Sequence, residues 1–409
     1  MNRPEYDVIV LGARCAGAPT AMLLARQGYR VLAVDKAIFP SDTVSTHLVH
    51  PPAIAALHRW GLLDRVVATG CPAIETYTFD LGPFAITGRP GTSEFPVAYA
   101  PRRTVLDKIL VDAAAGAGVE VREEFTVESV LQEDGRVRGI RGHGKDGKPV
   151  EERARVVVGA DGRGSMLVKE VRPETYQDKP PVFVGYYSYW SGLPMEGRMV
   201  GYIRPGRSFA AWPTNNDTTL VIAGWPYAEM EANKKDIEGN YHKTLDLVPD
   251  FAARIRAAKR EERFVGMAVP NYFRRPFGPG WALVGDAGYN RDFITAFGIM
   301  DAFHQAELCT TALDRFFGGS ATYEAAMGQY QCARDERALP MYDMTLKLAA
   351  VDQPPPPEMQ RLLAAVHRNP EACDAFARLN AGVMTPPEFF SKENVERIFA
   401  AAGAAQVGP

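Results

Sequence analysis

The first thirty-five residues constrain the fold of this chain more than any other stretch. An apolar run over residues 7–11 enters a turn with a glycine at each end, Gly12-Ala13-Arg14-Cys15-Ala16-Gly17. We predict a helix over residues 16–27, stopped by Gly28, and a second buried strand over residues 29–34. Such a strand–turn–helix–strand unit aims unpaired backbone N–H groups and the positive end of the helix dipole at one point. The segment therefore predicts a site that suits a pyrophosphate.

Asp35 strengthens this interpretation. It follows the second strand, 18 residues after Gly17, where a carboxylate can bind the two hydroxyls of an adenosine ribose. One position departs from the usual pattern, because Arg14 replaces the glycine that lets the backbone approach the phosphates. Either the turn opens slightly or the Arg14 guanidinium joins the phosphate contact. An ordinary strand–helix–strand turn is the alternative, and the motifs further along the chain decide between the two.

Length and composition limit the class of protein. With 409 residues, 46% of them hydrophobic, the chain is expected to form two interleaved domains. The net charge of -3 and the lack of Lys and Arg runs indicate no nucleic-acid partner. No apolar stretch reaches the ~20 residues of a membrane span and no signal sequence precedes the first strand, so we expect no membrane association and a cytoplasmic location. The five cysteines lack the spacing of a disulfide framework or a zinc site, so no metal is expected.

Two histidines follow Asp35 within a loop. The segment over residues 36–47 has too much turn chemistry for a helix, and His50 immediately precedes a helix that begins at Pro51. Histidine is the common acid–base side chain, although a lone histidine is more often structural. His47 is therefore a candidate catalytic residue, with a structural histidine as the alternative.

The middle of the chain alternates strands and helices. Short antiparallel strands are predicted over residues 73–99, a helix over residues 101–117, and two hairpins that turn at residues 134–135 and 146–147. A buried strand over residues 155–160 then ends in Asp161-Gly162-Arg163-Gly164-Ser165. An acidic residue and glycines at the carboxyl end of a parallel strand are placed to meet a ligand.

Residues 183–227 are rich in Tyr, Trp and Phe on segments that alternate like strands, which predicts a second sheet. These aromatic residues either form a packed core or line an apolar pocket in which a few phenols and a guanidinium orient a ligand. Both interpretations can hold for opposite faces of one sheet. Tyr187, Tyr189 and Arg204 are the catalytic candidates in this segment.

The last third of the chain is predicted to be mainly helical. Residues 236–259 are expected to be helical, and residues 264–270 a strand that returns to the first domain. A strand and ligand loop follow over residues 280–287, before a helix from Gly298 whose N-terminus would present backbone donors to a ligand. Residues 323–402 are mostly helical, with breaks expected at Pro340 and at the prolines 354–357.

Four motifs, taken in order, resemble a known family. They are Gly12 to Gly17 with Asp35, Arg103-x-x-Leu106-Asp107, Gly159-Ala160-Asp161-Gly162-Arg163-Gly164-Ser165, and Gly285-Asp286-Ala287. Over essentially the whole chain, this arrangement resembles the single-component flavoprotein monooxygenases of the para-hydroxybenzoate hydroxylase fold. The segment Phe209-Ala210-Ala211-Trp212-Pro213 is similar to a strand of the same superfamily, which includes halogenases and geranylgeranyl reductases. The paired tryptophans of the halogenase pattern W-x-W-x-I-P are absent.

The resemblance implies an α/β fold. A Rossmann-like FAD-binding domain of the GR2 type is expected over residues 1–72, 98–175 and 264–320. An antiparallel-sheet substrate domain, over residues 73–97 and 176–263, would be interleaved with it. Residues 321–409 would form a C-terminal helical region.

The resemblance also assigns residues to the cofactor. Asp35 would bind the adenosine ribose, Arg103 the phosphate or ribityl side of the flavin, and Asp286 the ribityl hydroxyls. Asp161 and Gly162 would lie by the pyrophosphate and the route of the nicotinamide donor. The helix from Gly298 would present backbone N–H groups to the pyrimidine edge of the isoalloxazine and stabilise negative charge on the reduced flavin. The cofactor-binding candidates are Gly12, Arg14, Cys15, Ala16, Gly17, Asp35, Lys36, Arg103, Asp161, Gly162, Gly285, Asp286, Gly298, Ile299 and Met300.

Three residues depart from the family pattern near the flavin. Phe293 stands where relatives commonly have proline, Phe297 stands just before the helix glycine, and Met300 replaces a frequent polar residue. The two phenylalanines are expected to narrow the space in front of the flavin and to make it drier.

The resemblance implies an FAD-dependent monooxygenase. NAD(P)H, a transient electron donor, would reduce FAD, and O2 would form a flavin C4a-hydroperoxide that hydroxylates an electron-rich, phenol-like aromatic substrate. His47, Tyr187, Tyr189 and Arg204 are the candidates for polarising the substrate hydroxyl. The alternatives are a flavin-dependent reductase of an isoprenoid or other C=C substrate and a non-catalytic flavin-binding partner subunit. The chain is expected to be a monomer or a homodimer.

Overall fold

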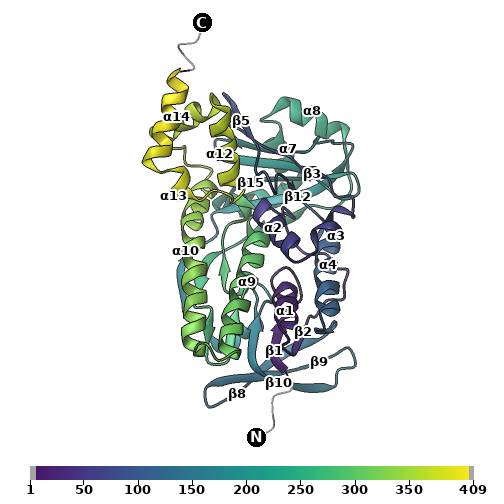
Figure 1. Ribbon diagram of the computed structural model, residues 1–409. Coiled ribbons are helices and arrows are strands. Elements are labelled where there is room, and N and C mark those ends of the chain that lie inside the picture. Colours follow the sequence, from purple (N-terminus) through teal and green to yellow (C-terminus); the bar gives the residue numbers. More distant parts are fainter. Residues whose placement is uncertain (1–5, 405–409) are drawn as a thin grey trace.

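In the computed structural model, which describes residues 6–404, a mainly parallel sheet lies in the lower half of the molecule (Figure 1). Its order is β19 (Phe277–Gly278), β20 (Trp281–Leu283), β10 (Pro149–Gly159), β1 (Tyr6–Leu11), β2 (Val31–Val34) and β7 (Glu120–Arg122). β1 is central and runs parallel to both β10 and β2. The turn after β1 therefore opens at the middle of the sheet's carboxyl edge, between two strands that carry other motifs.

Alternation along β1 builds two cores, one on each face of this sheet. Val8 and Val10 belong to a core with α1 (Gly17–Arg26), α4 (Arg103–Gly116) and α9 (Gly298–Phe317). Ile9 and Leu11 belong to a second core on the other face. This core includes the hairpin of β8 (Thr126–Glu133) and β9 (Arg136–His143), in which β9 pairs with β10. The sheet is thus buried on both faces, as its nearly continuous apolar strands require.

The second sheet lies in the upper half of Figure 1. Its order is β16 (Lys259–Arg260), β12 (Phe183–Ser191), β15 (Thr218–Pro226), β14 (Arg207–Thr214), β13 (Arg198–Arg204), β4 (Thr76–Asp80) and β5 (Ala85–Gly88). β17 (Val265–Ala268) pairs with β12. The aromatic residues do divide between faces: Tyr186 and Trp190 pack under α7 (Ile237–Leu245) and α8 (Pro249–Ala257), whereas Tyr187 and Tyr189 lie on the opposite face.

Smaller elements connect these two sheets. β11 (Thr175–Lys179), β18 (Asn271–Arg274) and β21 (Tyr289–Asn290) form a three-stranded sheet that packs on α10 (Tyr323–Ala349), and β3 (Ala73–Ile74) pairs with β6 (Ala98–Tyr99). The other helices are α2 (Pro51–Arg59), α3 (Leu63–Val67), α5 (Met166–Val171), α6 (Met230–Asn233), α11 (Pro357–His367), α12 (Pro370–Asn380), α13 (Pro386–Phe389) and α14 (Lys392–Ala404).

The predicted α/β architecture is confirmed, with three differences in detail. α10 continues through Pro340, because the buried side chains of Met341 and Tyr342 hold its second half in place. Residues 236–259 form two helices instead of one, since α8 begins at Pro249. β17, expected in the first domain, belongs to the second sheet.

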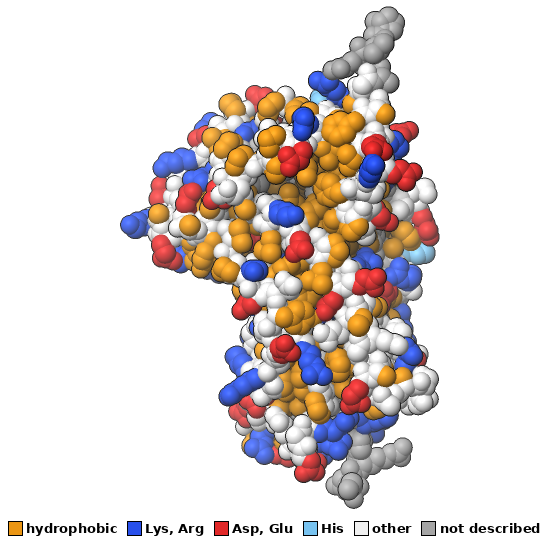
Figure 2. Space-filling model, turned by 90° about the vertical axis from the view of Figure 1, so that its left-hand side faces the viewer, with side chains coloured by type: hydrophobic (Ala, Val, Ile, Leu, Met, Phe, Trp, Pro, Cys, Tyr) orange, Lys and Arg blue, Asp and Glu red, His pale blue; other side chains and the backbone are white. Residues whose placement is uncertain are grey.

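Within residues 6–404, no helix combines the length and the apolar composition that crossing a membrane requires. Figure 2 shows the face that lies on the left in Figure 1, where charged side chains of both signs are scattered among apolar ones. This face carries no extended basic surface.

Candidate functional site

A cavity of about 890 Å³ opens between the carboxyl edge of the parallel sheet, the start of α9 and strand β17 of the second sheet. This volume falls within the ~300–1,000 Å³ typical of small-molecule and cofactor sites. Its walls come from the turn after β1, the loop after β2, the loop after β10, β17 and the segment from Gly285 to Gln305. All four sequence motifs therefore contribute to one cavity.

The glycines of the first turn are required by close packing. Gly12 has a φ of +91°, and a Cβ there would lie 2.6 Å from the carbonyl oxygen of Ala160. A Cβ on Gly17 would lie 1.7 Å from the carbonyl oxygen of Gly12, and one on Gly285 would lie 2.7 Å from the Cβ of Ala16. The turn after β1 therefore packs in direct contact with the end of β10 and with the 285–287 loop. The N-terminus of α1, at the end of this turn, faces the cavity.

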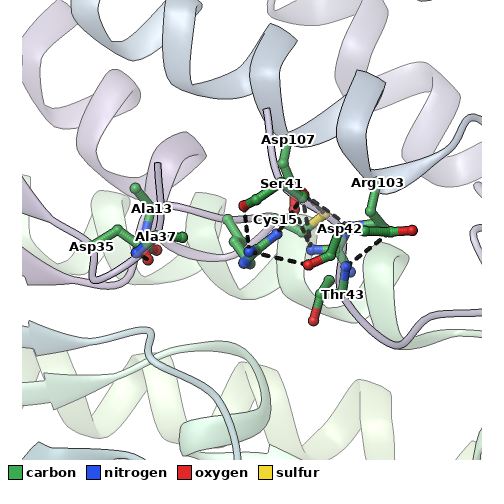
Figure 3. Close-up of polar contacts among 10 residues, drawn as sticks. Ala13, Cys15, Asp35, Ala37, Ser41, Asp42, Thr43, Arg103 and Asp107 are labelled. Atoms are coloured by element: carbon green, nitrogen blue, oxygen red, sulfur yellow. Dashed lines mark hydrogen bonds and ion pairs between the residues drawn. The ribbon is translucent and has the colours of Figure 1, made fainter. Parts of the chain in front are cut away.

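Asp35 is oriented by the backbone around it (Figure 3). Its two carboxylate oxygens accept hydrogen bonds from the backbone N–H groups of Ala13 and Ala37, each at 2.8 Å. The side chain is buried at the cavity wall, whereas the neighbouring Lys36 is exposed there. The carboxylate is therefore fixed at the end of β2, where the sequence predicted a ribose contact.

Asp107 lies at the centre of a buried charge cluster (Figure 3). Its carboxylate accepts hydrogen bonds from Arg14 Nη1 at 2.7 Å and from both Nε and Nη2 of Arg103 at 3.0 Å. The Cys15 thiol donates to it at 3.3 Å, and burial raises the pKa of that thiol. Arg14 also donates to the Ser41 hydroxyl at 2.8 Å. The guanidinium of Arg14 thus anchors the loop after β2 to α4.

Two further acids, both predicted as cofactor contacts, line the cavity. Asp161 accepts a hydrogen bond from the backbone N–H of Met166 at 2.6 Å, and its other oxygen has no partner among residues 6–404. Burial raises the pKa of Asp161 and of Asp286, and for Asp286 the nearby Arg163 and Arg103 oppose the increase. Gly162 has a φ of +76°, and a Cβ there would meet nothing within 4 Å. The cavity wall around Asp161 and Gly162 therefore offers an unpartnered carboxylate oxygen next to space that a ligand could fill.

The N-terminus of α9 faces the cavity at Gly298 and Ile299. No side chain caps this helix, so its first backbone N–H groups have no partner within the helix. The Met300 side chain points elsewhere, because a Cβ on Gly382 of the C-terminal region would lie 2.7 Å from its Cε. Any contact of Met300 with a ligand therefore involves its backbone.

The two phenylalanines near this helix have different positions. Phe293 lines the cavity, and its ring lies on the bare backbone of Gly185 in β12, where a Cβ would be 3.0 Å from two ring carbons. Phe297 is buried behind the wall and meets the His50 ring edge-on at a centroid distance of 4.7 Å. Phe293 alone narrows the cavity.

His47, Tyr187 and Tyr189 lie together behind the cavity wall formed by Ser45 and Thr46. His47 Nε2 is hydrogen-bonded to the Tyr189 hydroxyl, and Tyr187 accepts a hydrogen bond from the Ser45 N–H at 3.4 Å. Burial, together with the positive charges of Arg103 and Arg102, lowers the pKa of His47 well below 6.5. The histidine is therefore neutral at pH 7, and burial and the two arginines disfavour its protonated form.

Arg204 is not part of this group. It lies at the end of β13, where its Nη1 donates to the carboxylate of Asp80 at 2.8 Å, and it does not line the cavity. The strand carries its side chain toward the β4–β5 turn, so the structure separates it from the other three catalytic candidates. Within residues 6–404, no group of three or more His, Cys, Asp or Glu side chains is arranged to hold a metal ion.

The sequence analysis missed two buried charged residues in the cavity wall. Arg291 and Asp292 directly precede Phe293, and both are buried. Asp292 Oδ1 accepts the Ile294 N–H at 3.0 Å, and burial raises the pKa of Asp292 from 3.8 to about 7. The sequence did contain a signal for them: Arg291 and Asp292 are adjacent charged residues between the predicted strand and loop over residues 280–287 and the predicted helix from Gly298.

Comparison with known proteins decides which family this cavity belongs to. Residues 5–243 match the model of the family described as FAD binding domain. The chain belongs to this family. The resemblance found in the sequence is therefore confirmed, and the protein is an FAD-dependent oxidoreductase of the aromatic hydroxylase and halogenase superfamily.

Relatives of this FAD-binding protein have varied activities. A tryptophan 2-halogenase from Chondromyces crocatus is 26% identical over 338 residues, which cover 79% of this chain but 64% of that enzyme. A digeranylgeranylglycerophospholipid reductase from Methanosarcina mazei is 27% identical over 338 residues, covering 79% of this chain and 76% of the reductase.

Solved structures share the fold. The flavin-dependent brominase Bmp2 aligns with a TM-score of 0.79 and 19% identity, over 98% of this chain and 99% of the brominase. PqsL from Pseudomonas aeruginosa, described as a probable FAD-dependent monooxygenase, aligns with a TM-score of 0.70 and 21% identity, over 91% of this chain and 99% of PqsL.

Proposed function

We propose that the protein is a monooxygenase that uses FAD, NAD(P)H and O2 to hydroxylate an electron-rich, phenol-like aromatic molecule. The observation that carries the proposal is the hydrogen bond between His47 and Tyr189 directly behind the cavity wall. A phenol attacks an electrophilic oxygen only when its hydroxyl proton is lost or shared, so the reaction needs an acceptor near that hydroxyl. The hydroxyls of Tyr187 and Tyr189, with neutral His47 bonded to Tyr189, would share this proton by hydrogen bonding.

The cavity fits FAD on its own geometry. Gly12 and Gly17 keep side chains out of the turn that would receive the pyrophosphate, and Asp35 would hold the adenosine ribose. Asp286, half-buried after the end of β20, would accept hydrogen bonds from the ribityl hydroxyls. The open space beside Gly298, where a Cβ would meet nothing within 4 Å, would admit the flat flavin edge.

When bound, FAD supplies hydride uptake from NAD(P)H and activation of O2. The uncapped N–H groups of α9 place positive potential where the flavin's pyrimidine edge would lie, which favours the negatively charged reduced form. Arg163 and Lys169 line the cavity as exposed cations, and they would suit the phosphates of a transiently bound nicotinamide donor.

The protein groups behind the wall would polarise the substrate hydroxyl. A phenol placed against Ser45 would lie next to the Tyr187 hydroxyl, which accepts the Ser45 N–H. The Tyr187 and Tyr189 rings meet edge-on at 5.8 Å, and Tyr189 is hydrogen-bonded to His47. The neutral imidazole would act as a hydrogen-bond partner of these hydroxyls and would itself stay uncharged.

Apolar residues close the same end of the cavity. Val44, Met267, Val269 and Phe293 line it. The apolar surface of this wall suits the faces of an aromatic ring.

The test is to titrate the FAD-loaded protein anaerobically with NADPH and NADH, with phenols, anilines and polycyclic aromatics added in turn. We expect one aromatic to accelerate bleaching of the flavin absorbance, and an atom from labelled 18O2 to enter that compound on aeration. Peroxide as the sole product with every compound would overturn the proposal.

A second candidate is reduction of a C=C bond in an isoprenoid chain. The similarity to digeranylgeranylglycerophospholipid reductase and the apolar wall around Met267 favour it. A reductase would form product under strict anaerobiosis with NAD(P)H or a chemical reductant, whereas a monooxygenase would not.

A further inference from the structure

Arg291 is a buried cation whose donors are mostly unused. Its side chain is 5% exposed, and its Nη2 donates to Asp301 Oδ2 at 2.8 Å. Its Nε and Nη1 are buried and have no hydrogen-bond partner among residues 6–404. Buried polar atoms in native proteins are almost always partnered. Unused donors on a charged group in a cavity wall therefore point to a ligand.

Another buried arginine of this protein shows the contrast. Arg334 is 1% exposed and does not line the cavity. Its Nε donates to Asp335 at 2.8 Å, its Nη1 to the carbonyl oxygen of Gly288 at 3.3 Å, and its Nη2 to the Tyr176 hydroxyl at 2.7 Å. Arg334 thus has each guanidinium nitrogen bonded, whereas Arg291 has one of three.

The position of Arg291 is fixed relative to α9. Asp301 lies in the first turn of this helix, and the Arg291 guanidinium also stacks over the ring of Phe297, its N-cap residue, at 4.8 Å. Arg291, Gly298, Ile299 and Asp301 all line the cavity. The guanidinium therefore stands beside the uncapped N–H groups of the helix.

We propose that Arg291 and the N-terminus of α9 together form a site for negative charge at the pyrimidine edge of the bound flavin, and that Asp301 limits the strength of this site. Positive charge near this edge makes the flavin easier to reduce. The Asp301 carboxylate offsets part of the charge of Arg291 at close range. The inference rests on the placement of the flavin given under the proposed function, and it is independent of hydroxylation.

Sulfite is a suitable probe, because it needs neither substrate nor O2. Its sulfur lone pair forms a bond to flavin N5, and the displaced electron pair of the ring places a negative charge over N1 and the C2 carbonyl, with no proton taken up. The dissociation constant, read from the loss of visible absorbance, therefore reports how well the protein holds negative charge at that edge. The midpoint potential of bound FAD is an independent readout.

Three variants separate a charge effect from a structural one. Arg291→Gln should weaken sulfite binding roughly tenfold and lower the midpoint potential, whereas Arg291→Lys should remain near the parent value. Asp301→Asn should change both quantities in the opposite direction from Arg291→Gln, because it removes the charge that opposes Arg291.

Opposite shifts in the Gln and Asn variants would support the proposal. Shifts in the same direction, or unchanged sulfite affinity and potential in FAD-loaded variants, would overturn it. If Arg291→Gln fails to retain FAD, Asp301→Asn alone decides: tighter sulfite binding supports the proposal and weaker binding overturns it. Failure of hydroxylation with every aromatic would overturn the proposed function and leave this result standing.

Discussion

A single carboxylate in the cavity wall, Asp286, gives a direct test of the proposed cofactor site. Asp286 is half-buried, and the positive charges of Arg163 and Arg103 oppose the rise of its pKa. We expect Asp286→Ala to lose FAD while the chain stays folded, because the variant removes acceptors for a buried polar ligand. The measurement is the FAD content and circular dichroism of the purified protein, with Asp352→Ala at an exposed position as the control. A yellow Asp286→Ala protein with parent FAD affinity would show that this carboxylate does not contact the cofactor.

Asp292 gives the protein a predictable pH dependence. Burial raises its pKa to about 7, so the native state keeps this proton between pH 4 and 7, where the unfolded chain has lost it. The native state then binds more protons, and the contribution of Asp292 to stability falls as the pH rises through this window. Asp292→Asn should be more stable than the parent at pH 8, by up to roughly 4 kcal/mol, and the difference should shrink toward pH 4. Urea unfolding at both pH values measures it, and a pH-independent difference would contradict the prediction.

The turn after β1 depends on the absence of side chains. Gly17→Ala would place a Cβ 1.7 Å from the carbonyl oxygen of Gly12, which is backbone and cannot yield. We expect this variant to lose FAD and to unfold at markedly lower urea concentration. Gly328→Ala is the control, because a Cβ at this site inside α10 meets nothing within 4 Å. That substitution should raise stability by about 0.5–1 kcal/mol, and equal effects of the two would contradict the steric argument.

The short helical turn η4 (Phe293–Thr295) shapes the substrate end of the cavity. Proline suits its first position, because Asp292 before it has the extended conformation that precedes proline. Phe293→Pro should therefore keep FAD affinity and change the ratio of hydroxylated product to NAD(P)H consumed, since the ring over Gly185 is lost. An unchanged ratio with the best aromatic substrate would show that the ring does not shape the reacting space.

Helices, strands and turns could be predicted from the sequence, whereas contacts between residues far apart in the chain could not. The turn from Gly12 to Gly17 and its helix are fixed by neighbours in the chain, so glycine spacing and apolar runs were sufficient to find them. Asp107 was visible as part of a motif, but its bond to Arg14 joins residues 93 positions apart. Pro340 predicted a break that the packing of Met341 and Tyr342 prevents. The partner of β17 and the burial of Asp292 likewise depend on tertiary contacts.

The C-terminal helices support the cofactor end of the cavity from a distance. Gly382 has a φ of +70°, and a Cβ there would lie 2.7 Å from the Cε of Met300 in the first turn of α9. The end of the Met300 side chain is flexible and can move, so Gly382→Ala should weaken FAD binding only modestly, by shifting Met300 at the start of α9, as well as strain the backbone. Gly319→Ala is the matched control, because Gly319 has a φ of +75° and a Cβ there meets nothing within 4 Å. Comparing the FAD dissociation constants of the two variants separates strain from contact, and equal constants would contradict a role for this support.

The order of the elements along the chain determines when each part of the cavity can form during translation. The glycine turn after β1 is translated first, β10 and β20 join the same sheet much later, and Gly382 is translated near the end. At roughly 5–20 residues per second, about 20–70 s pass between synthesis of Gly17 and synthesis of Gly382. β1 gains β2 as a neighbour early and β10 only after residue 159 has been translated. The contact between Gly382 and the start of α9 can form only near the end of translation.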